Sequence, residues 1–320
     1  MTPDSELPRR RFGQSSLEVT PICIGSTIRG DLAGSGDYPA PEDRHTALFR
    51  ALFNSPINFL DTAANYGNGE SERRIGLVLR EIGGLPDGFV LATKADRDPQ
   101  TGDFSGDQAR RSIEHSLSVL GLDHLQLVYL HDPEFATQSF EEFNAPGGAV
   151  EALVRLKQEG VIDLIGISGG PIDMLLRYVE TGVWDAVITH NRYTLLSHVA
   201  DPLLSGASRR GLAVVNAAPY ASGILAKGPD ALPHYVYREA PAEVVQAARQ
   251  IQAVCQEYGV PLAAAALQFS LRDPRITSTV VGITRPERIQ ETLALAAVPI
   301  PDEAWPRLEA LAIPDLDPQR

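Results

Sequence analysis

Four side chains that can handle protons each lie at or just after the end of an apolar, β-branched run. Asp61 ends such a run and precedes Tyr66 by five residues within LDTAANYGNGESERRIG (60–76). The run FVLATK ends on Lys94, and LQLVYLH ends on His131. In a parallel α/β barrel the carboxyl ends of the strands meet at one mouth, where catalytic groups sit. The spacing therefore predicts that a carboxylate, a phenol, an ammonium and an imidazole share one site.

Each of these residues alone also has an ordinary structural explanation. Asp61 could cap the following helix, and Lys94 could be a solvated strand end. His131 could be a loop histidine bonded to its own backbone, and Tyr66 could be a turn aromatic within NYGNG. The same pattern at three consecutive strand ends favours the shared site.

The elements that would position these residues alternate along the chain. Short apolar segments without strict polar alternation are typical of parallel strands covered on both faces. Eight occur, at 21–25, 57–62, 89–93, 125–130, 164–168, 186–189, 212–217 and 278–282. Helix-length amphipathic stretches lie between them, for example at 42–54, 70–80, 105–120, 148–159, 171–180 and 285–297.

Residues that typically begin and end helices agree with this pattern. Ser105 precedes an amphipathic run, and Gly121 and Gly160 follow helical runs as C-terminal caps would. An extra helical stretch is expected at 241–258. Repeated β and α alternation predicts an α/β fold, a (β/α)8 TIM barrel. We expect one domain over residues 1–320, with an N-terminal β-hairpin and extra helices near the C-terminus.

The composition excludes several classes of protein. A net charge of −13 and a pI near 5.0 argue against nucleic acid or an anionic membrane surface as partner. The basic run Arg9 to Arg11 is expected to be a solvated entry to the first strand. Cys23 and Cys255 lie far apart and in no ligand spacing, so we expect no metal site and no disulfide. Without an apolar leader or a membrane-spanning stretch, we expect a cytoplasmic protein.

Several segments that follow strands are long: 26–41, 95–105, 132–147 and 218–240. Such lengths are uncommon without function. The polar and aromatic groups that they carry would suit a partly polar small molecule, although for each residue alone a plain surface position is the favoured interpretation. These residues are Arg29, Asp31, Tyr38, Phe135, Tyr220, His234, Tyr235 and Tyr237. Trp184 precedes a strand, so we expect it in the core at the opposite end.

The chain resembles the aldo-keto reductases over almost its whole length. The resemblance is carried by RRFG, LDTAANYGNGESERRIG, LATK, DHLQLVYLHDPE, GVIDLIGIS and RPERIQETL, in the family's order and spacing. NAAPYASGIL makes it most similar to the branch of D-threo-aldose, L-fucose and pyridoxal dehydrogenases. That branch implies an aldose 1-dehydrogenase acting on a small sugar. A general carbonyl reductase or a pyridoxal dehydrogenase is the alternative.

The resemblance places the family's catalytic tetrad on Asp61, Tyr66, Lys94 and His131. Tyr66 would be the general acid and base. Because a free tyrosine has a pKa of about 10, an adjacent cation that stabilises its phenolate would help. Lys94 would be that cation, held charged by Asp61. His131 would hydrogen-bond the carbonyl oxygen of the substrate.

The resemblance also implies NAD or NADP as cofactor, although no GxGxxG motif opens a Rossmann unit. The residues expected to bind it are Gly25, Ser26, Thr27, Asp61, Ser168, Gly169, His190, Pro219, Tyr220, Ser222, Gly223, Leu225, Gly282, Ile283, Thr284, Arg288 and Glu291. Several positions depart from the family. Gly169 and His190 stand where an asparagine and a glutamine usually hold the carboxamide. Ala217 stands where many members have a stacking tyrosine, so stacking either comes from elsewhere, with Tyr220 as the candidate, or is absent.

At the adenosine end, Gly282 and Ile283 replace a lysine and a serine common in NADP-dependent members, which leaves dual use of NAD and NADP as the expectation. Two other classes of function stay open. One is a non-catalytic subunit that senses the cofactor, and the other is a lyase that forms a Schiff base on Lys94. We expect a monomer or a small homo-oligomer.

Overall fold

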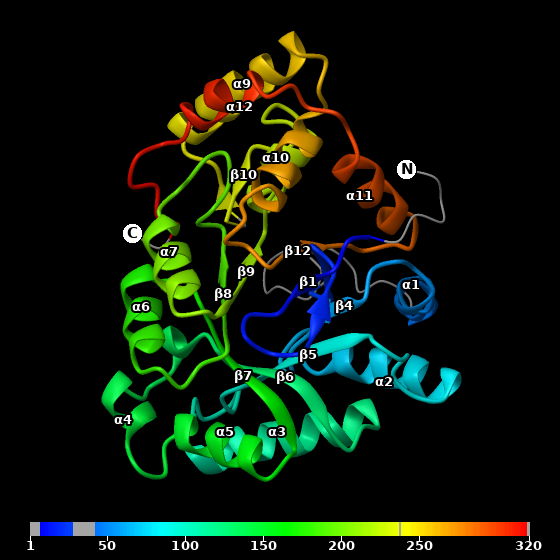
Figure 1. The fold of residues 1–320 in the computed structure, drawn as a ribbon, viewed down its shortest axis with the longest axis vertical. Coiled ribbons are helices and arrows are strands. Elements are labelled where there is room, and N and C mark those ends of the chain that lie inside the picture. Colours follow the sequence, from blue (N-terminus) through cyan, green and yellow to red (C-terminus); the bar gives the residue numbers. More distant parts are fainter. Residues whose placement is uncertain (1–6, 28–41, 237, 319–320) are drawn as a thin grey trace.

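The computed structural model describes residues 7–27, 42–236 and 238–318, and its centre is a closed barrel of eight parallel strands (Figure 1). The order around the barrel is β12, β3, β4, β5, β6, β7, β8 and β9. The strands are β3 (Ile22–Gly25), β4 (Phe59–Asp61), β5 (Val90–Ala95), β6 (Leu125–His131), β7 (Ile162–Gly169), β8 (Ala186–His190), β9 (Ala213–Ala217) and β12 (Ser278–Gly282). The predicted (β/α)8 barrel is confirmed.

Each barrel strand leads into a helix on the outside of the barrel (Figure 1). These helices are α1 (Glu42–Phe53), α2 (Glu70–Ile82), α3 (Gly106–Leu120), α5 (Ala149–Gln158), α6 (Ile172–Glu180), α7 (Asp201–Arg209), α10 (Leu262–Leu271) and α11 (Glu287–Ala296). As predicted, Ser105 caps α3 by accepting from Gln108 N, and Gly121 ends that helix in the left-handed region.

The interior of the barrel is filled by alternate residues of the strands, because side chains of a strand alternate between its two faces. This inner core contains Phe59, Val90, Leu127 and Tyr129. Gly166 on β7 leaves room for Tyr129, since a Cβ there would lie 2.4 Å from the tyrosine ring. An outer core lies between the strands and the helices and includes Trp184, as predicted.

An antiparallel hairpin of β1 (Arg10–Arg11) and β2 (Glu18–Val19) precedes the barrel, which confirms the predicted N-terminal hairpin. Its Phe12 meets Phe59 edge to face, at 5.8 Å between ring centroids, so the hairpin closes the amino-terminal end of the barrel. Arg10 donates to the carbonyls of Ile276 and Leu271, so it is a structural anchor rather than a solvated residue.

Two segments predicted as plain loops contain short elements. Between β6 and α5 lie the 3₁₀ helix η2 (Pro133–Phe135) and α4 (Phe140–Asn144), which starts with a capping box between Ser139 and Glu142. Between β9 and α10 lie η3 (Ala221–Gly223), α8 (Ile224–Lys227) and a hairpin of β10 (His234–Tyr235) and β11 (Arg238–Glu239). They are followed by α9 (Ala242–Glu257), which confirms the helix predicted at 241–258.

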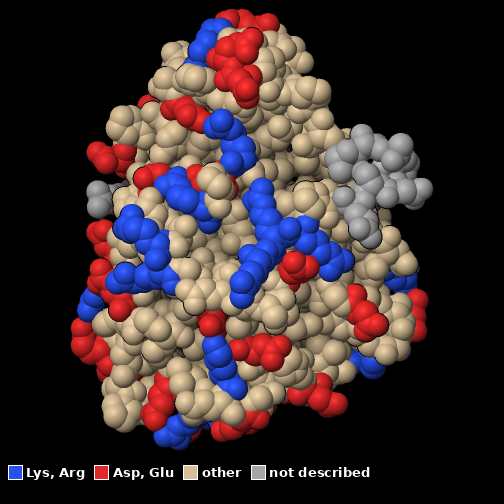
Figure 2. Space-filling model, in the orientation of Figure 1, with Lys and Arg blue, Asp and Glu red and all other residues tan. Residues whose placement is uncertain are grey.

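The extra helices near the C-terminus are α9 and α12 (Ala304–Glu309), which pack together at one end of the molecule (Figure 1). Among the described residues, no helix is both long and apolar enough to cross a membrane. Figure 2 shows basic side chains near the middle of one face, with acidic side chains around and between them.

Candidate active site

The alternation that fills the barrel also determines which side chains reach its mouth. Val90 and Ala92 face the inner core, and Lys94 continues the same row on β5. Leu127 and Tyr129 lead in the same way to His131 on β6. On β5 and β6, the last inward-facing side chain at the carboxyl end is therefore polar, whereas those before it belong to the core.

Asp61 and Lys94 form a buried ion pair at this mouth. Lys94 Nζ lies 2.7 Å from Asp61 Oδ2 and donates to the Thr62 carbonyl at 2.6 Å. Their side chains are 1% and 5% exposed, respectively. Burial would lower the pKa of Lys94, but the Asp61 carboxylate and the Tyr66 phenol raise it above its usual value. Lys94 is therefore a cation, and its amine is a poor nucleophile for a Schiff base.

Tyr66 lies against this pair. Its ring centroid is 4.5 Å from Lys94 Nζ, so the ammonium lies close enough to act on the phenol. Burial raises the pKa of Tyr66 to about 12, although the Lys94 charge acts in the opposite direction. The expected effect of Lys94 is present, but burial outweighs it. The phenol is consequently protonated at neutral pH and can act as an acid.

His131 completes the predicted group of four. Its ring meets the Tyr66 ring edge to face, at 5.5 Å between centroids and an angle of 77°. Its Nδ1 lies 2.5 Å from Asp96 Oδ1, and its Nε2 lies 3.7 Å from Asp132 Oδ2. Burial would lower the pKa of His131, but these two carboxylates raise it above its usual value. The structure thus brings all four predicted residues together.

Sequence reasoning missed Asp96, which is 3% exposed. A signal was available, because Asp96 stands two residues after Lys94 and so continues the same inward row. The carboxylate also accepts from Asn65 N at 2.9 Å, which ties the loop that carries Tyr66 to the end of β5.

A second polar cluster lies beside His131, around the expected carboxamide site. Asp132, Glu134 and His190 each place a polar side-chain atom within 4.8 Å of the others. Ser168 Oγ donates to Asp132 Oδ1 at 3.3 Å, and Gly170 N donates to Glu134 Oε1 at 2.7 Å. Burial, together with Asp132, raises the pKa of Glu134 to about 7, and burial lowers the pKa of His190.

Gly169 is in van der Waals range of this cluster. A Cβ added there would meet Met174 Cε at 2.7 Å and Glu134 Oε2 at 3.1 Å. The asparagine usual in the family would therefore require the flexible Met174 side chain to move and the Glu134 carboxylate to shift slightly. The departures at 169 and 190 belong to one rearranged polar cluster, in which Asp132 and Glu134 are additional members that the sequence did not predict.

The segment after β9 has an unusual backbone. Ala218, Ala221, Ser222 and Gly223 all have φ between 47° and 100°. Such residues persist only where surrounding structure or a ligand favours them, and they cluster at binding sites. The hydroxyl of Ser222 is buried and has no partner among the described residues. Pro219 and Tyr220 lie in this segment, whereas Leu225 is fully buried in the core, so its side chain offers no surface to a ligand.

The end of β12 and the start of α11 carry the residues expected at the adenosine end. Gly282 is exposed and has open space around it, and Ile283 is buried. Glu291 pairs with Arg288 at 3.1 Å and with Arg285 at 3.0 Å, all three being about half exposed. The predicted Arg288 and its neighbour Arg285 are therefore already partly neutralised by one carboxylate.

Of the remaining predicted contacts, Gly25 ends β3 and Ser26 follows it. Ser26 Oγ accepts from Ser71 Oγ at 2.7 Å and is fully buried. Thr27 and Thr284 lie beyond the same strand ends, at the mouth. Phe135 is 55% exposed on η2. Arg29, Asp31, Tyr38 and Tyr237 lie outside the described residues.

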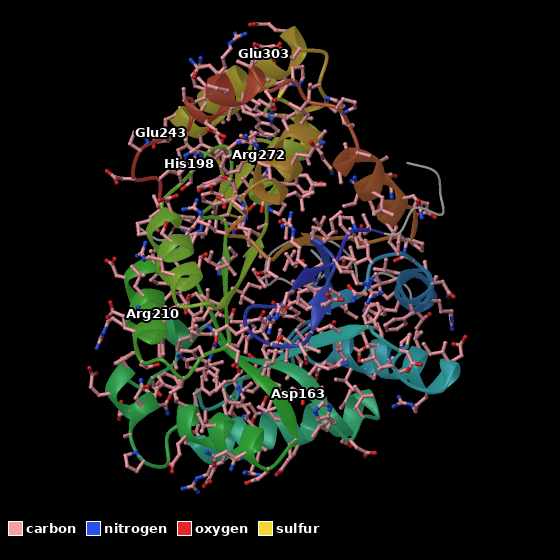
Figure 3. All side chains as sticks on the ribbon, viewed as in Figure 1. Asp163, His198, Arg210, Glu243, Arg272 and Glu303 are labelled. Atoms are coloured by element: carbon pink, nitrogen blue, oxygen red, sulfur yellow. The ribbon has the colours of Figure 1, made fainter. Side chains whose placement is uncertain are left out.

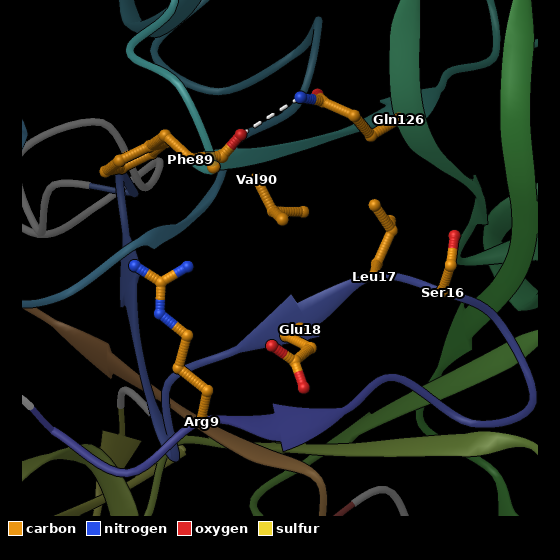
Figure 4. Close-up of a pocket in the computed structure, with 8 residues that line it drawn as sticks. Arg9, Ser16, Leu17, Glu18, Phe89, Val90 and Gln126 are labelled. Atoms are coloured by element: carbon orange, nitrogen blue, oxygen red, sulfur yellow. Dashed lines mark hydrogen bonds between the residues drawn. The ribbon is translucent and has the colours of Figure 1, made fainter.

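A separate hollow occurs at the amino-terminal end of the barrel, beside the hairpin (Figure 4). It is lined by residues that include Arg9, Glu18, Phe89 and Gln126. None of the tetrad lines it, and Gln126 is tied to the Phe89 carbonyl at 3.0 Å. This hollow is therefore separate from the four residues, which lie at the opposite end, at the carboxyl ends of the strands.

Comparison with known proteins agrees with this geometry. Residues 21–313 match the model of the aldo/keto reductase family. An aldo-keto reductase structure from Bacillus halodurans superposes with a TM-score of 0.76 at 23% identity, covering 96% of this chain and 97% of the other. That structural likeness shows the fold.

Three curated relatives are similar over most of their length. L-galactose dehydrogenase of Arabidopsis thaliana is 30% identical, covering 97% of this chain and 96% of the relative. Pyridoxal 4-dehydrogenase of Microbacterium luteolum is 30% identical, covering 94% and 96%. D-threo-aldose 1-dehydrogenase of a Pseudomonas species is 34% identical, covering 85% and 89%. The chain therefore belongs to the aldo/keto reductase family of NAD(P)-dependent oxidoreductases, as its sequence predicted.

Proposed function

We propose that this protein is an aldose 1-dehydrogenase, which oxidises the anomeric carbon of a small sugar to a lactone and can run the reverse reduction. The observation that carries the proposal is the contact of the Tyr66 phenol with the buried Lys94–Asp61 pair, beside the His131 ring. L-galactose and D-threo-aldose dehydrogenases are among the relatives, which supports a sugar as substrate. A pyridoxal-type substrate is the alternative, supported by a third relative.

The residues of the site can manage the proton that this reaction moves. In the direction of reduction, the protonated Tyr66 donates to the carbonyl oxygen, and the Lys94 ammonium stabilises the phenolate that remains. Asp61 keeps Lys94 charged throughout. In the direction of oxidation the phenolate is needed as base, so the rate rises with pH. General acid and base catalysis of this kind contributes roughly 10² to 10⁴-fold.

Several features of the mouth fit a nicotinamide dinucleotide, which supplies or accepts the hydride when bound. Buried polar atoms without a partner among the described residues include Ser222 Oγ, Asn191 Oδ1 and Glu134 Oε2. After β9, the buried Ser222 hydroxyl lies in a left-handed backbone segment and would be able to donate to an anion such as a pyrophosphate. Ser168 and His190, next to Asp132 and Glu134, would hold the carboxamide.

NAD is favoured over NADP at the adenosine end. Glu291 already pairs with Arg285 and Arg288, so a 2′-phosphate would meet a carboxylate within the same cluster. A ribose 2′-hydroxyl could instead donate to that carboxylate. The expected result is a higher kcat/KM with NAD⁺ than with NADP⁺, measured with the same sugar.

The test is the variant Tyr66→Phe, followed through the absorbance of the reduced nicotinamide. A panel of L-fucose, L-galactose, D-arabinose, pyridoxal and simple aldehydes identifies the substrate. Tyr66→Phe should lose at least about 10²-fold in kcat while keeping cofactor affinity, because only the proton donor is removed. Tyr258→Phe, at the surface beside Glu303 and Arg307, is the matched control.

A rate unchanged in Tyr66→Phe would remove this residue from the mechanism. Cofactor binding without turnover of any member of the panel would instead favour a subunit that senses the cofactor.

A further inference from the structure

The two nitrogens of the His131 ring have different surroundings. Nδ1 is 2.5 Å from Asp96 Oδ1, and Asp96 is buried. A carboxylate at neutral pH can only accept hydrogen bonds, so Nδ1 carries a proton. This bond fixes the plane of the ring, in which the opposite nitrogen, Nε2, is the one that remains for a ligand.

Nε2 makes no hydrogen bond within the described part of the chain. Asp132 Oδ2 lies 3.7 Å away from it, which is too far for a hydrogen bond but near enough to favour a charge on the ring. The Tyr66 ring packs nearly perpendicular to the His131 ring, with 5.5 Å between the two centroids.

The charges that face His131 favour a protonated ring. The carboxylates of Asp96, just after β5, and Asp132, just after β6, act in this direction, and the Lys94 ammonium opposes them. His190 on β8 also faces the cluster, but burial keeps its pKa low and the ring neutral. Tyr66 is an uncharged phenol at neutral pH, and Glu134 has a pKa of about 7. Two carboxylates thus raise the pKa of His131, and one ammonium lowers it.

We infer that Asp96 is a positioning residue of this enzyme: together with Asp132 it holds His131 as an imidazolium whose Nε2–H faces the reacting oxygen. This inference rests on the proposed function, because it assigns the oxygen of the substrate to the site beside Tyr66. An imidazolium is a stronger hydrogen-bond donor than a neutral ring, since bonds from ionised donors are roughly twice as strong. It stabilises the negative charge that develops on the oxygen during reduction.

The variant Asp96→Asn removes the charge while keeping the size of the side chain. Without that carboxylate the pKa of His131 falls, so the ring loses its proton at a lower pH. The alkaline limb of kcat/KM for reduction should therefore move to lower pH. At pH 8 the loss should be roughly 10 to 100-fold, with a smaller loss at pH 6, by comparison with the loss of an oxyanion donor. KM should change less than kcat.

A second readout does not depend on turnover. In spectra of protein labelled with ¹⁵N-histidine, His131 is one of seven histidines and is assigned through its absence in His131→Gln. Its ring nitrogens should report a doubly protonated ring in the unmodified protein at a pH where Asp96→Asn shows a neutral one. Asp132→Asn should shift the titration in the same direction, and it leaves the Asn65 contact of Asp96 intact should Asp96→Asn disturb the loop.

The chain provides a matched control at the other end of the barrel. Asp163, labelled in Figure 3, pairs with His124 at 2.9 Å, but both side chains are exposed. Asp163→Asn should leave the pH profile and the His131 titration unchanged. An unaltered His131 titration in both Asp96→Asn and Asp132→Asn would overturn the inference, even if Tyr66→Phe still abolishes turnover. If Tyr66→Phe is active, the proposed function fails instead, and the ring titration still decides the role of Asp96.

Discussion

Breaking the Lys94–Asp61 pair should cost far more stability than the pair itself contributes. At 2.7 Å the attraction is about 6 kcal/mol for an effective dielectric constant of about 20. Burying the two ions costs several kcal/mol each, so the intact pair is close to neutral in the free energy of unfolding. Removing one partner leaves the other ion buried and uncompensated, which costs about 3 to 5 kcal/mol.

A double-mutant cycle of Asp61→Leu and Lys94→Met measures this effect. Each single variant should be destabilised by about 3 to 5 kcal/mol, since each leaves one buried polar group without its partner. The double variant should be less destabilised than the two losses added together, with a coupling energy of about 3 kcal/mol. Some loss remains, because the Thr62 carbonyl also accepts from Lys94 and would be left unpaired.

The assay is urea unfolding followed by circular dichroism, with turnover measured on the same samples. Glu159→Gln breaks an exposed pair with Arg110 and should leave the free energy of unfolding almost unchanged. All three site variants should lack turnover, so stability recovers in the double variant without activity. Losses that simply add would refute the reasoning, because they would mean that the two buried charges do not depend on each other.

Two further substitutions test the surroundings of the site. On α2, burial raises the pKa of Glu72 to about 7, above its value in the unfolded chain, so stability is lost as pH rises toward and through 7. In thermal unfolding, Glu72→Gln should therefore recover up to about 3 kcal/mol at pH 8 and little at pH 4. Equal effects at both pH values would contradict this. Gly76→Ala would place a Cβ 2.1 Å from the Val119 carbonyl, so it should lower the free energy of unfolding by at least about 1 to 3 kcal/mol. The control is Gly206→Ala on α7, whose Cβ would meet only the flexible Leu176 side chain. It should be neutral or stabilising in the same thermal unfolding experiments.

Most of the fold could be predicted because the barrel repeats one pattern. Apolar runs such as 125–130 and punctuating residues such as Ser105 and Gly121 recur, and each repeat supports the interpretation of the next. The helix α4 escaped this pattern because it is only five residues long, too short to show a helical repeat beyond Phe140 and Phe143. Its capping box, Ser139 with Glu142, was nevertheless present in the sequence as a signal.

The site residues at strand ends could be predicted from the sequence, whereas properties that depend on how deeply a group is buried could not. Lys94 and His131 follow from alternation along β5 and β6, and Asp96 could have been found by extending that alternation by two residues. The pKa of Tyr66 could not, because it is a balance of two opposed effects. The sequence indicates the Lys94 charge, which lowers it, but only the packed structure shows the burial that outweighs this charge.

The high pKa of Tyr66 affects which other residue must stabilise the reacting oxygen. A phenol with a pKa of about 12 is a ready donor only if something else stabilises the oxygen that receives its proton. Lys94 is committed to Asp61, Tyr66 and the Thr62 carbonyl, so it reaches the phenolate rather than the substrate. His131, set between Asp96 and Asp132, is the cationic donor left for that oxygen. Asp96 and Asp132 therefore keep His131 positively charged, and this charge offsets the acidity that Tyr66 loses through burial.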